Sequence, residues 1–72
     1  MTEYPVVFTR EDDGRFSVFA PDLLGCVSWG NTRDEARANI REAIELWIAS
    51  ATADGETIPI PGSSVEAVAV AI

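Results

Sequence analysis

The sequence has no histidine, no lysine and a single cysteine, Cys26, among its 72 residues. One cysteine excludes a disulfide bond within the chain. Without histidine, a lone thiolate cannot assemble a structural zinc site, which takes four cysteine or histidine ligands. Domains below about 80 residues commonly need a disulfide, a metal ion or a partner chain for stability. By elimination, we expect this chain to associate with copies of itself or with another protein.

Basic residues are also scarce, because five arginines stand against twelve carboxylates, a formal net charge of −7. This charge disfavours nonspecific binding to nucleic acid and attracts a basic partner. No apolar run approaches the roughly 20 residues needed to span a bilayer. Glu3 and Pro5 interrupt the basic-then-apolar pattern of a signal peptide. We therefore expect one cytoplasmic domain that does not act at a membrane.

The first part of the chain predicts a β-hairpin. Tyr4–Arg10 and Arg15–Ala20 are rich in β-branched and aromatic residues, as strands are. Between them, Glu11–Gly14 ends in the Asp-Gly pair that is typical of a tight hairpin turn. Because side chains alternate along a strand, Phe19 lies on the face opposite to Val18. Neither face of the sheet is therefore wholly polar, and we expect the second face to be covered by something outside the monomer.

The stretch Pro21–Thr32 has to end the second strand, form a third and start a helix. Pro21 has no N–H group, so it ends a strand or lies at an edge. Gly25 permits backbone conformations that other residues avoid, and Asp22 can accept a local backbone N–H in a turn. Cys26–Trp29 predicts a short third strand.

A helix is predicted to begin after Thr32, which is placed as its N-cap with Glu35 completing a capping box. Asp54-Gly55 is predicted to end it, with Gly55 in the left-handed conformation. Apolar residues recur between these ends at spacings of three and four, which makes a single stripe that would pack on a sheet. The stripe consists of Ala36, Ile40, Ala43, Ile44, Trp47, Ile48 and Ala51.

The end of the chain predicts a connector and a last strand. Prolines in Ile58–Pro61 bias each preceding residue toward extended angles. Val65–Ile72 has strong strand character and little charge. Since an exposed apolar edge strand invites aggregation, we expect this strand to be central or paired with a neighbouring chain. The predicted fold is α+β, a two-layer β-β-β-α-β arrangement with an antiparallel sheet and one helix on one of its faces.

Few residues suggest chemistry. The acidic cluster Glu11–Asp13 could coordinate a divalent cation, but it lacks the spaced ligands of a calcium loop, so a solvated turn is favoured. Cys26 has no basic neighbour in sequence to activate it and is interpreted as a small apolar residue. Arg33, Arg37 and Arg41 form a ridge along the helix. Nearby carboxylates favour a charged surface over a nucleic-acid contact.

The two tryptophans have different interpretations. Trp47 belongs to the apolar stripe of the helix and is predicted to lie in the core. Trp29 either packs in the core or faces outward and anchors an interface, and the sequence leaves both alternatives open.

Several short motifs, in this order, resemble those of HicB-type antitoxins. They are YPVVF, the acidic Asp-Gly turn, PDLxGC, NTRDEA, NIREAIEL, the Asp-Gly helix end and IPIP. Each motif is weak alone, but their order and spacing cover nearly the whole chain.

The resemblance implies a β-β-β-α-β domain described as a degenerate RNase H-like fold without nuclease activity. It also implies a partner, a small basic HicA-type toxin that cleaves RNA with a histidine. Many members carry a C-terminal DNA-binding domain, whereas this sequence reaches Ile72 in a predicted strand. We therefore expect a single HicB-like domain over residues 1–72, with no direct DNA binding.

The favoured hypothesis is a noncatalytic antitoxin that needs no cofactor and occludes a basic mRNA-cleaving toxin. The alternative is a structural or regulatory homo-oligomer, a dimer or tetramer, without a toxin partner. A metal-dependent hydrolase built on Asp12, Asp13 and Asp22 is a distant third. The residues expected at the toxin or subunit interface are Phe19, Asp22, Leu23, Leu24 and Trp29.

Overall fold

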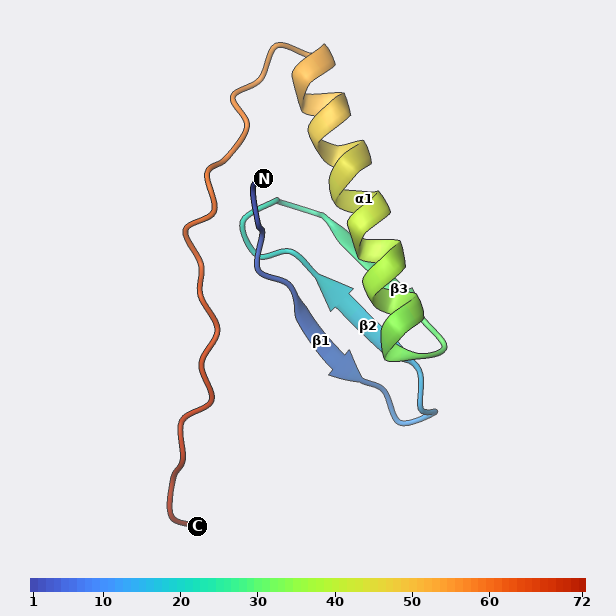
Figure 1. The fold of residues 1–72 in the computed structure, drawn as a ribbon. Helices are drawn as coiled ribbons and strands as arrows, with labels where there is room; N and C mark the ends of the chain where they lie inside the picture. Colours follow the sequence, from blue (N-terminus) through green and yellow to red (C-terminus); the bar gives the residue numbers. More distant parts are fainter.

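The computed structural model describes all 72 residues and shows three antiparallel strands followed by one helix. The elements are β1 (Val7–Arg10), β2 (Phe16–Phe19), β3 (Val27–Gly30) and α1 (Arg33–Ala53) (Figure 1). The strands form one sheet in the order β1-β2-β3, and α1 lies across one face of it. This confirms the α+β class predicted from the sequence.

The register of the sheet decides which side chains share a face. Val7 lies opposite Phe19, and Phe19 lies opposite Val27. In the next row, Ser17 lies opposite Trp29. All these side chains project away from α1, because residues two apart on a strand share one face. We call this side of the sheet the outer face; it carries Val7, Thr9, Ser17, Phe19, Val27 and Trp29.

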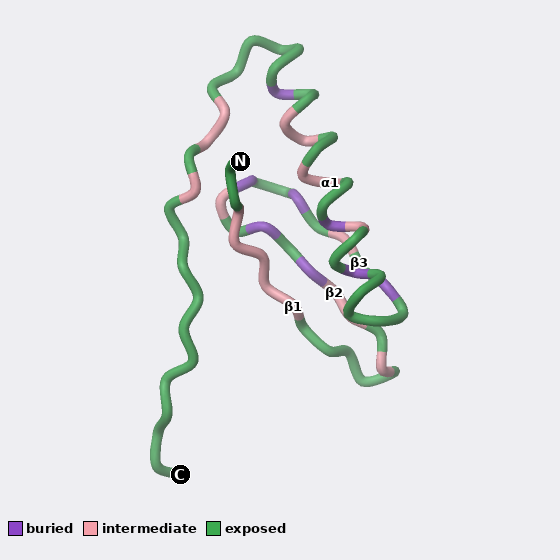
Figure 2. The backbone as a smooth tube through the Cα atoms, viewed as in Figure 1, coloured by how far each residue is buried: buried purple, intermediate pink, exposed green.

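The core lies between the other face of the sheet and α1. Figure 2 shows the buried positions along β2, the turn after it and the adjoining side of the helix. The buried cluster consists of Val18, Ala20, Leu23, Cys26, Ala36 and Ile40. Ala43, Ile44 and Trp47 are partly buried and pack against this cluster, so the predicted apolar stripe of the helix is confirmed.

The ends of α1 follow the predicted signals. The Oγ1 atom of Thr32 accepts the N–H of Glu35 at 3.1 Å, as an N-cap should. The Glu35 carboxylate reaches back to the N–H of Asn31 at 3.2 Å, one residue before the cap. At the other end, Gly55 has a φ of 72°, the left-handed conformation that a residue without Cβ adopts readily.

All three strands differ in their bounds from the predicted ones. β2 spans Phe16–Phe19 and lacks the predicted end residues Arg15 and Ala20, and β3 ends at Gly30, one residue later than predicted. β1 starts at Val7 and is shorter than the predicted Tyr4–Arg10, since Pro5 cannot donate a ladder hydrogen bond. β3 begins one residue later than the predicted Cys26–Trp29, because the N–H of Cys26 bonds to a carbonyl of the preceding turn instead.

The predicted last strand, Val65–Ile72, is not formed in the single chain. The observed element order is therefore β-β-β-α, without the fifth element of the predicted β-β-β-α-β order. No backbone–backbone hydrogen bond involves a residue beyond Glu56. The chain leaves the end of α1, passes through the non-helical connector Ile58–Pro61 and runs past the sheet to its C-terminus (Figure 1). Strand propensity is local, whereas a strand exists only when a neighbour accepts its hydrogen bonds.

The one helix, α1, is not long and apolar enough to cross a membrane.

Candidate functional site

The outer face of the sheet carries an exposed apolar patch. Phe19, Val27 and Trp29 are 41 %, 65 % and 53 % exposed. Phe19 and Val27 are paired directly across β2 and β3, so their side chains form one continuous patch. Beside this patch, the turn before β3 holds Leu24, which is 92 % exposed. Contiguous exposed apolar side chains of this kind mark surfaces that bind another protein.

A shallow hollow of about 260 Å³ lies between this patch and the turn. It is lined by Phe19, Ala20, Pro21, Leu23, Leu24, Gly25, Cys26 and Val27. Two residues of the predicted interface, Phe19 and Leu24, therefore lie together, and Val27 joins them. Trp29 lies two residues farther along β3, on the same face as Val27.

Leu23 and Leu24 have opposite environments although they are adjacent. Leu23 is 1 % exposed and packs in the core, so its side chain is not at the surface where the predicted interface contact would place it. The indole N–H of Trp47 donates to the carbonyl oxygen of Leu24 at 2.9 Å. This hydrogen bond holds the turn that contains Leu24 against α1. Trp47 packs on the core as predicted. Trp29 is 53 % exposed and faces outward, so it does not pack in the core, and its role as an interface anchor stays a prediction.

Asp22 holds the C-terminal part of the chain. Its Oδ1 atom accepts hydrogen bonds from the N–H and the hydroxyl of Ser63, at 3.1 and 2.9 Å. Nearby, the Tyr4 hydroxyl donates to the Pro59 carbonyl at 2.6 Å. Asp22 was expected at an interface with another chain. In the monomer its carboxylate is occupied by Ser63, so it acts as an anchor within the chain.

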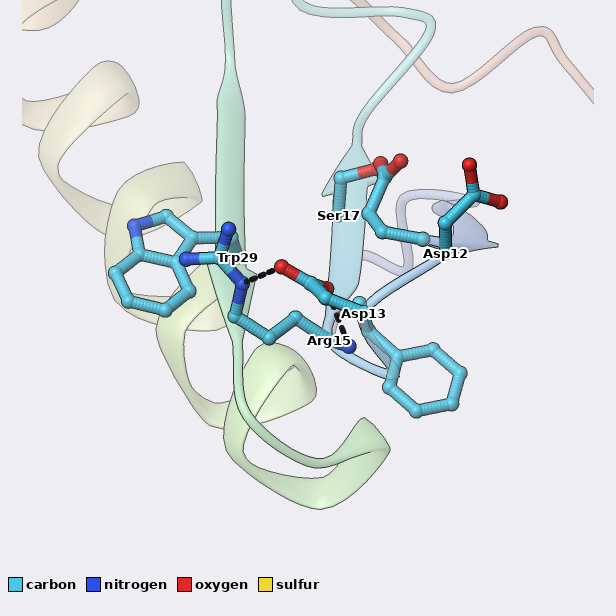
Figure 3. Close-up of a pocket in the computed structure, with 7 residues that line it drawn as sticks. Asp12, Asp13, Arg15, Ser17 and Trp29 are labelled. Atoms are coloured by element: carbon cyan, nitrogen blue, oxygen red, sulfur yellow. Dashed lines mark hydrogen bonds and ion pairs between the residues drawn. The ribbon is translucent and has the colours of Figure 1, made fainter.

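A second, larger hollow of about 530 Å³ adjoins Trp29 at the hairpin turn (Figure 3). The Nε of Arg15 bonds to Oδ2 of Asp13 at 2.7 Å, and its guanidinium lies 5.3 Å from the centre of the Trp29 ring. The backbone N–H of Arg15 lowers the pKa of the Asp13 carboxyl. Glu11 accepts the Ser17 hydroxyl at 2.7 Å.

These contacts bear on the proposed cation site at the hairpin. Asp13 is bound to Arg15 and Glu11 to Ser17, so the carboxylates serve separate partners. No group of three or more potential metal ligands is brought together anywhere in the chain. The hairpin turn instead places an acidic margin at one end of the outer face. This margin consists of Glu11, Asp12 and Asp13.

The remaining chemical candidates are explained by packing. Burial raises the pKa of the Cys26 thiol, which disfavours the reactive thiolate. Arg33 lies over the Phe8 ring with its guanidinium 4.3 Å from the ring centre. Arg37 binds Asp34 at 2.8 Å. Two of the three arginines of the predicted ridge are thus used within the monomer.

Val27 and Arg15 belong to the site and were not among the residues predicted for it. The alternation that placed Phe19 outward applies equally to Val27 and Trp29, because they lie two residues apart on one strand. The contact between Arg15 and Trp29 depends on the pairing of β2 with β3 and has no signal in the sequence.

The anchor at Asp22 predicts a specific response to pH. The Ser63 hydroxyl bond, the largest cause, lowers the pKa of Asp22 below its ordinary value of 3.8. Because the folded-state pKa is lowered, the bond between Asp22 and Ser63 contributes its full stability to the folded protein above the ordinary value. This contribution is lost as the pH falls through the folded-state pKa. The Ser63 amide resonance should therefore titrate in NMR spectra with a midpoint below 3.8.

In the Asp22→Asn variant, the same resonance should no longer titrate in this range. A midpoint at or above the ordinary aspartate value in the unchanged protein would show that Ser63 does not bind the carboxylate.

Comparison with known proteins matches most of this chain to one family. Residues 4–71 match the family model described as the HicB-like antitoxin of bacterial toxin–antitoxin systems. A UPF0150 protein of Synechocystis is 46% identical over 56 residues, 78% of this chain and 71% of the relative. Another, from Thermoplasma acidophilum, is 42% identical over 57 residues, 79% of this chain and 83% of the relative.

A solved structure has the same fold. The N-terminal domain of the Burkholderia pseudomallei antitoxin HicB superposes with a TM-score of 0.76 at 33% sequence identity, covering 85% of this chain and 72% of that one. The resemblance expected from the short motifs is confirmed. The chain belongs to the HicB-like antitoxin family of bacterial toxin–antitoxin systems.

Proposed function

We propose that this protein is an antitoxin that uses the outer face of its sheet to bind and occlude a small basic, HicA-like, mRNA-cleaving toxin. The observation that carries the proposal is the uncovered apolar patch of Phe19, Val27 and Trp29 on that face. Family membership supports a toxin as the partner in general.

The charges around the patch suit a basic partner. The chain carries a net charge of −7, and Glu11, Asp12 and Asp13 line the hollow next to Trp29 (Figure 3). Apolar and aromatic residues at the centre with charged residues at the margin is the usual composition of an interface. Carboxylates at the margin speed encounter with a cationic protein, while desolvated aromatic side chains at the centre hold it.

This mode of action needs no catalysis by the antitoxin. A protein that covers the RNA-binding surface of a toxin inhibits it by exclusion alone. Because mRNA is the toxin's substrate, the pair would act in the cytoplasm.

The central test is the Trp29→Ala variant. Truncation of a large aromatic anchor at an interface centre commonly costs 2 kcal/mol or more, so the affinity for the toxin should fall about 30-fold. Calorimetric titration against the product of the adjacent reading frame measures this affinity, and an RNA-cleavage assay measures inhibition. Leu46→Ala is the matched control, since Leu46 is exposed on α1, away from the outer face.

We expect Leu46→Ala to bind and inhibit like the unchanged protein. A toxin that stays active with the unchanged protein in excess would contradict the antitoxin role. Equal inhibition by Trp29→Ala would contradict the assignment of the outer face while leaving the role itself standing.

A second candidate function, a homo-oligomeric binding protein without a toxin, is favoured by a different observation. The apolar C-terminal segment Val65–Ile72 is exposed along its length. Sedimentation of the isolated protein tests the oligomer, and a stable monomer at micromolar concentration would contradict it. Self-association and toxin binding are compatible, because the outer face and the C-terminal segment are separate surfaces.

A further inference from the structure

The segment Val65–Ile72 has the composition of a strand that is covered on both sides. As a strand, its one side would carry Val65 and three alanines. Its other side would carry Glu66 followed by Val68, Val70 and Ile72. Strands that are apolar on both faces are typical of positions where both faces of a sheet are buried. In the monomer, Val68 and Val70 are each 73 % exposed. An unpaired segment of this kind is a ready partner for another strand.

The body of the molecule has a vacant position for one more strand. β1 pairs only with β2, so the other edge of β1 has free N–H and C=O groups. α1 has 21 residues and is about 31 Å long, whereas a four-residue strand covers about 13 Å. The C-terminal half of α1 therefore extends beyond the sheet, and its apolar side chains are only partly covered.

A groove of about 420 Å³ lies between α1 and the residues that lead into β1. Its six apolar lining residues are Met1, Tyr4, Val6, Ile40, Ile44 and Ile48. A strand added along the free edge of β1 directs every second side chain toward α1, and so into this groove. Small and β-branched side chains, such as those of the C-terminal segment, match the apolar part of this groove. Its other lining residues are Thr2, Arg37, Arg41 and Glu45.

Two hydrogen-bonded contacts before Val65 direct the C-terminal segment away from β1 of its own chain. Tyr4 holds Pro59, and Asp22 holds Ser63 through both its N–H and its hydroxyl. Only Ser64 separates this last anchor from Val65, so the chain has no slack in which to turn back. Figure 1 shows the segment separating from β1 and running free to the C-terminus. The molecule is accordingly elongated, 47 × 27 × 21 Å.

We propose that Val65–Ile72 of one copy adds as a fourth strand to the free edge of β1 in a second copy and fills that copy's groove. Each copy has both the segment and the groove, so the exchange is reciprocal and closes as a two-fold symmetric dimer. The exchange uses the edge of β1 and the side of the sheet next to α1, and it leaves the outer face open. It therefore does not rest on toxin binding and is tested without a toxin.

The first test compares oligomeric states by sedimentation equilibrium of the full chain at micromolar concentration. The unchanged protein should have twice the chain mass of 7.8 kDa. The double variant Ala69→Pro, Val70→Pro should have the mass of one chain. Neighbouring residues present their N–H groups to opposite edges of a strand, so one of the two prolines must remove a bond to β1.

Ile60→Pro is the matched control, because it adds a proline to the connector, between Pro59 and Pro61 and outside the exchanged segment. It should remain a dimer. The helical part of the circular dichroism of all three proteins should agree, because residues 69 and 70 lie outside α1. Only the double variant should lack the strand signal of the exchanged segment. A monomeric unchanged protein, or a dimer that survives both prolines in the segment, would overturn the proposal.

The second test establishes between which chains the contact is made. Isotope-labelled and unlabelled protein are unfolded together and refolded, and isotope-filtered NOE spectra are recorded. We expect cross-peaks from the methyl groups of Val68 and Val70 in one chain to those of Ile44 and Ile48 in the other. Cross-peaks to these isoleucines only within one chain, or none at all, would overturn the exchange.

Discussion

Replacing Leu23 with alanine is expected to lower the free energy of unfolding by about 2 to 5 kcal/mol. Leu23 is 1 % exposed and belongs to the core cluster between the sheet and α1, so truncation leaves a cavity in tightly packed surroundings. At roughly 0.05 to 0.15 kcal/mol per residue, a chain of this length has a total stability of about 4 to 11 kcal/mol. One leucine therefore accounts for a large fraction of it.

The neighbouring leucine is the control. Leu24→Ala should change the unfolding free energy by less than about 0.5 kcal/mol, because Leu24 is 92 % exposed. Urea unfolding followed by tryptophan fluorescence measures both variants, at one protein concentration because association contributes to apparent stability. Equal destabilisation by the two substitutions would contradict the placement of Leu23 inside and Leu24 outside. Weaker toxin binding by Leu24→Ala is expected on the proposed function.

Gly30→Ala is expected to destabilise the fold by about 1 to 3 kcal/mol or more. Gly30 lies where β3 meets the start of α1, and a Cβ atom there would be 2.9 Å from Cα of Ala36 and closer still to its backbone nitrogen. Backbone atoms cannot rotate away as a side chain could. The helix would have to separate from β3, and the packing of Ala36, which is fully buried, would be lost.

Gly62→Ala separates this steric effect from the general effect of removing a glycine. A Cβ at Gly62 would meet nothing nearer than 3.9 Å, an ordinary contact with Asp22. Because alanine restricts the unfolded chain more than glycine does, this substitution should be neutral or slightly stabilising. Thermal unfolding of the two variants should give clearly different midpoints. Similar midpoints would show that β3 and α1 are not in close contact at Gly30.

Leu23 and Leu24 show where prediction from the sequence ends. Both lie in a turn, where neither the two-residue period of a strand nor the 3.6-residue period of a helix applies. Nothing local tells which side chain faces the core. The position of Trp29, in the core or at the surface, could not be predicted for a related reason. The two faces of β3 can be assigned only once its pairing with β2 is known.

Asp22 shows the limit set by distance along the chain. Its type and its turn position predicted a local hydrogen bond, but its partner is Ser63, 41 residues away. The sequence has no signal for that pairing. This pairing determines the direction in which the C-terminal segment leaves the body of the molecule.

The sequence by itself determined the features whose causes are local: the hairpin, the helix with its capped ends and apolar stripe, the exclusion of disulfides and the acidic charge. Motif order also indicated the family, because those local features recur in one arrangement. Only the tertiary structure decided which leucine is buried, which tryptophan is exposed and which carboxylate is an anchor. It also decided that Val65–Ile72 is an unpaired segment in the monomer, since a strand needs a hydrogen-bonding neighbour that its own sequence cannot supply.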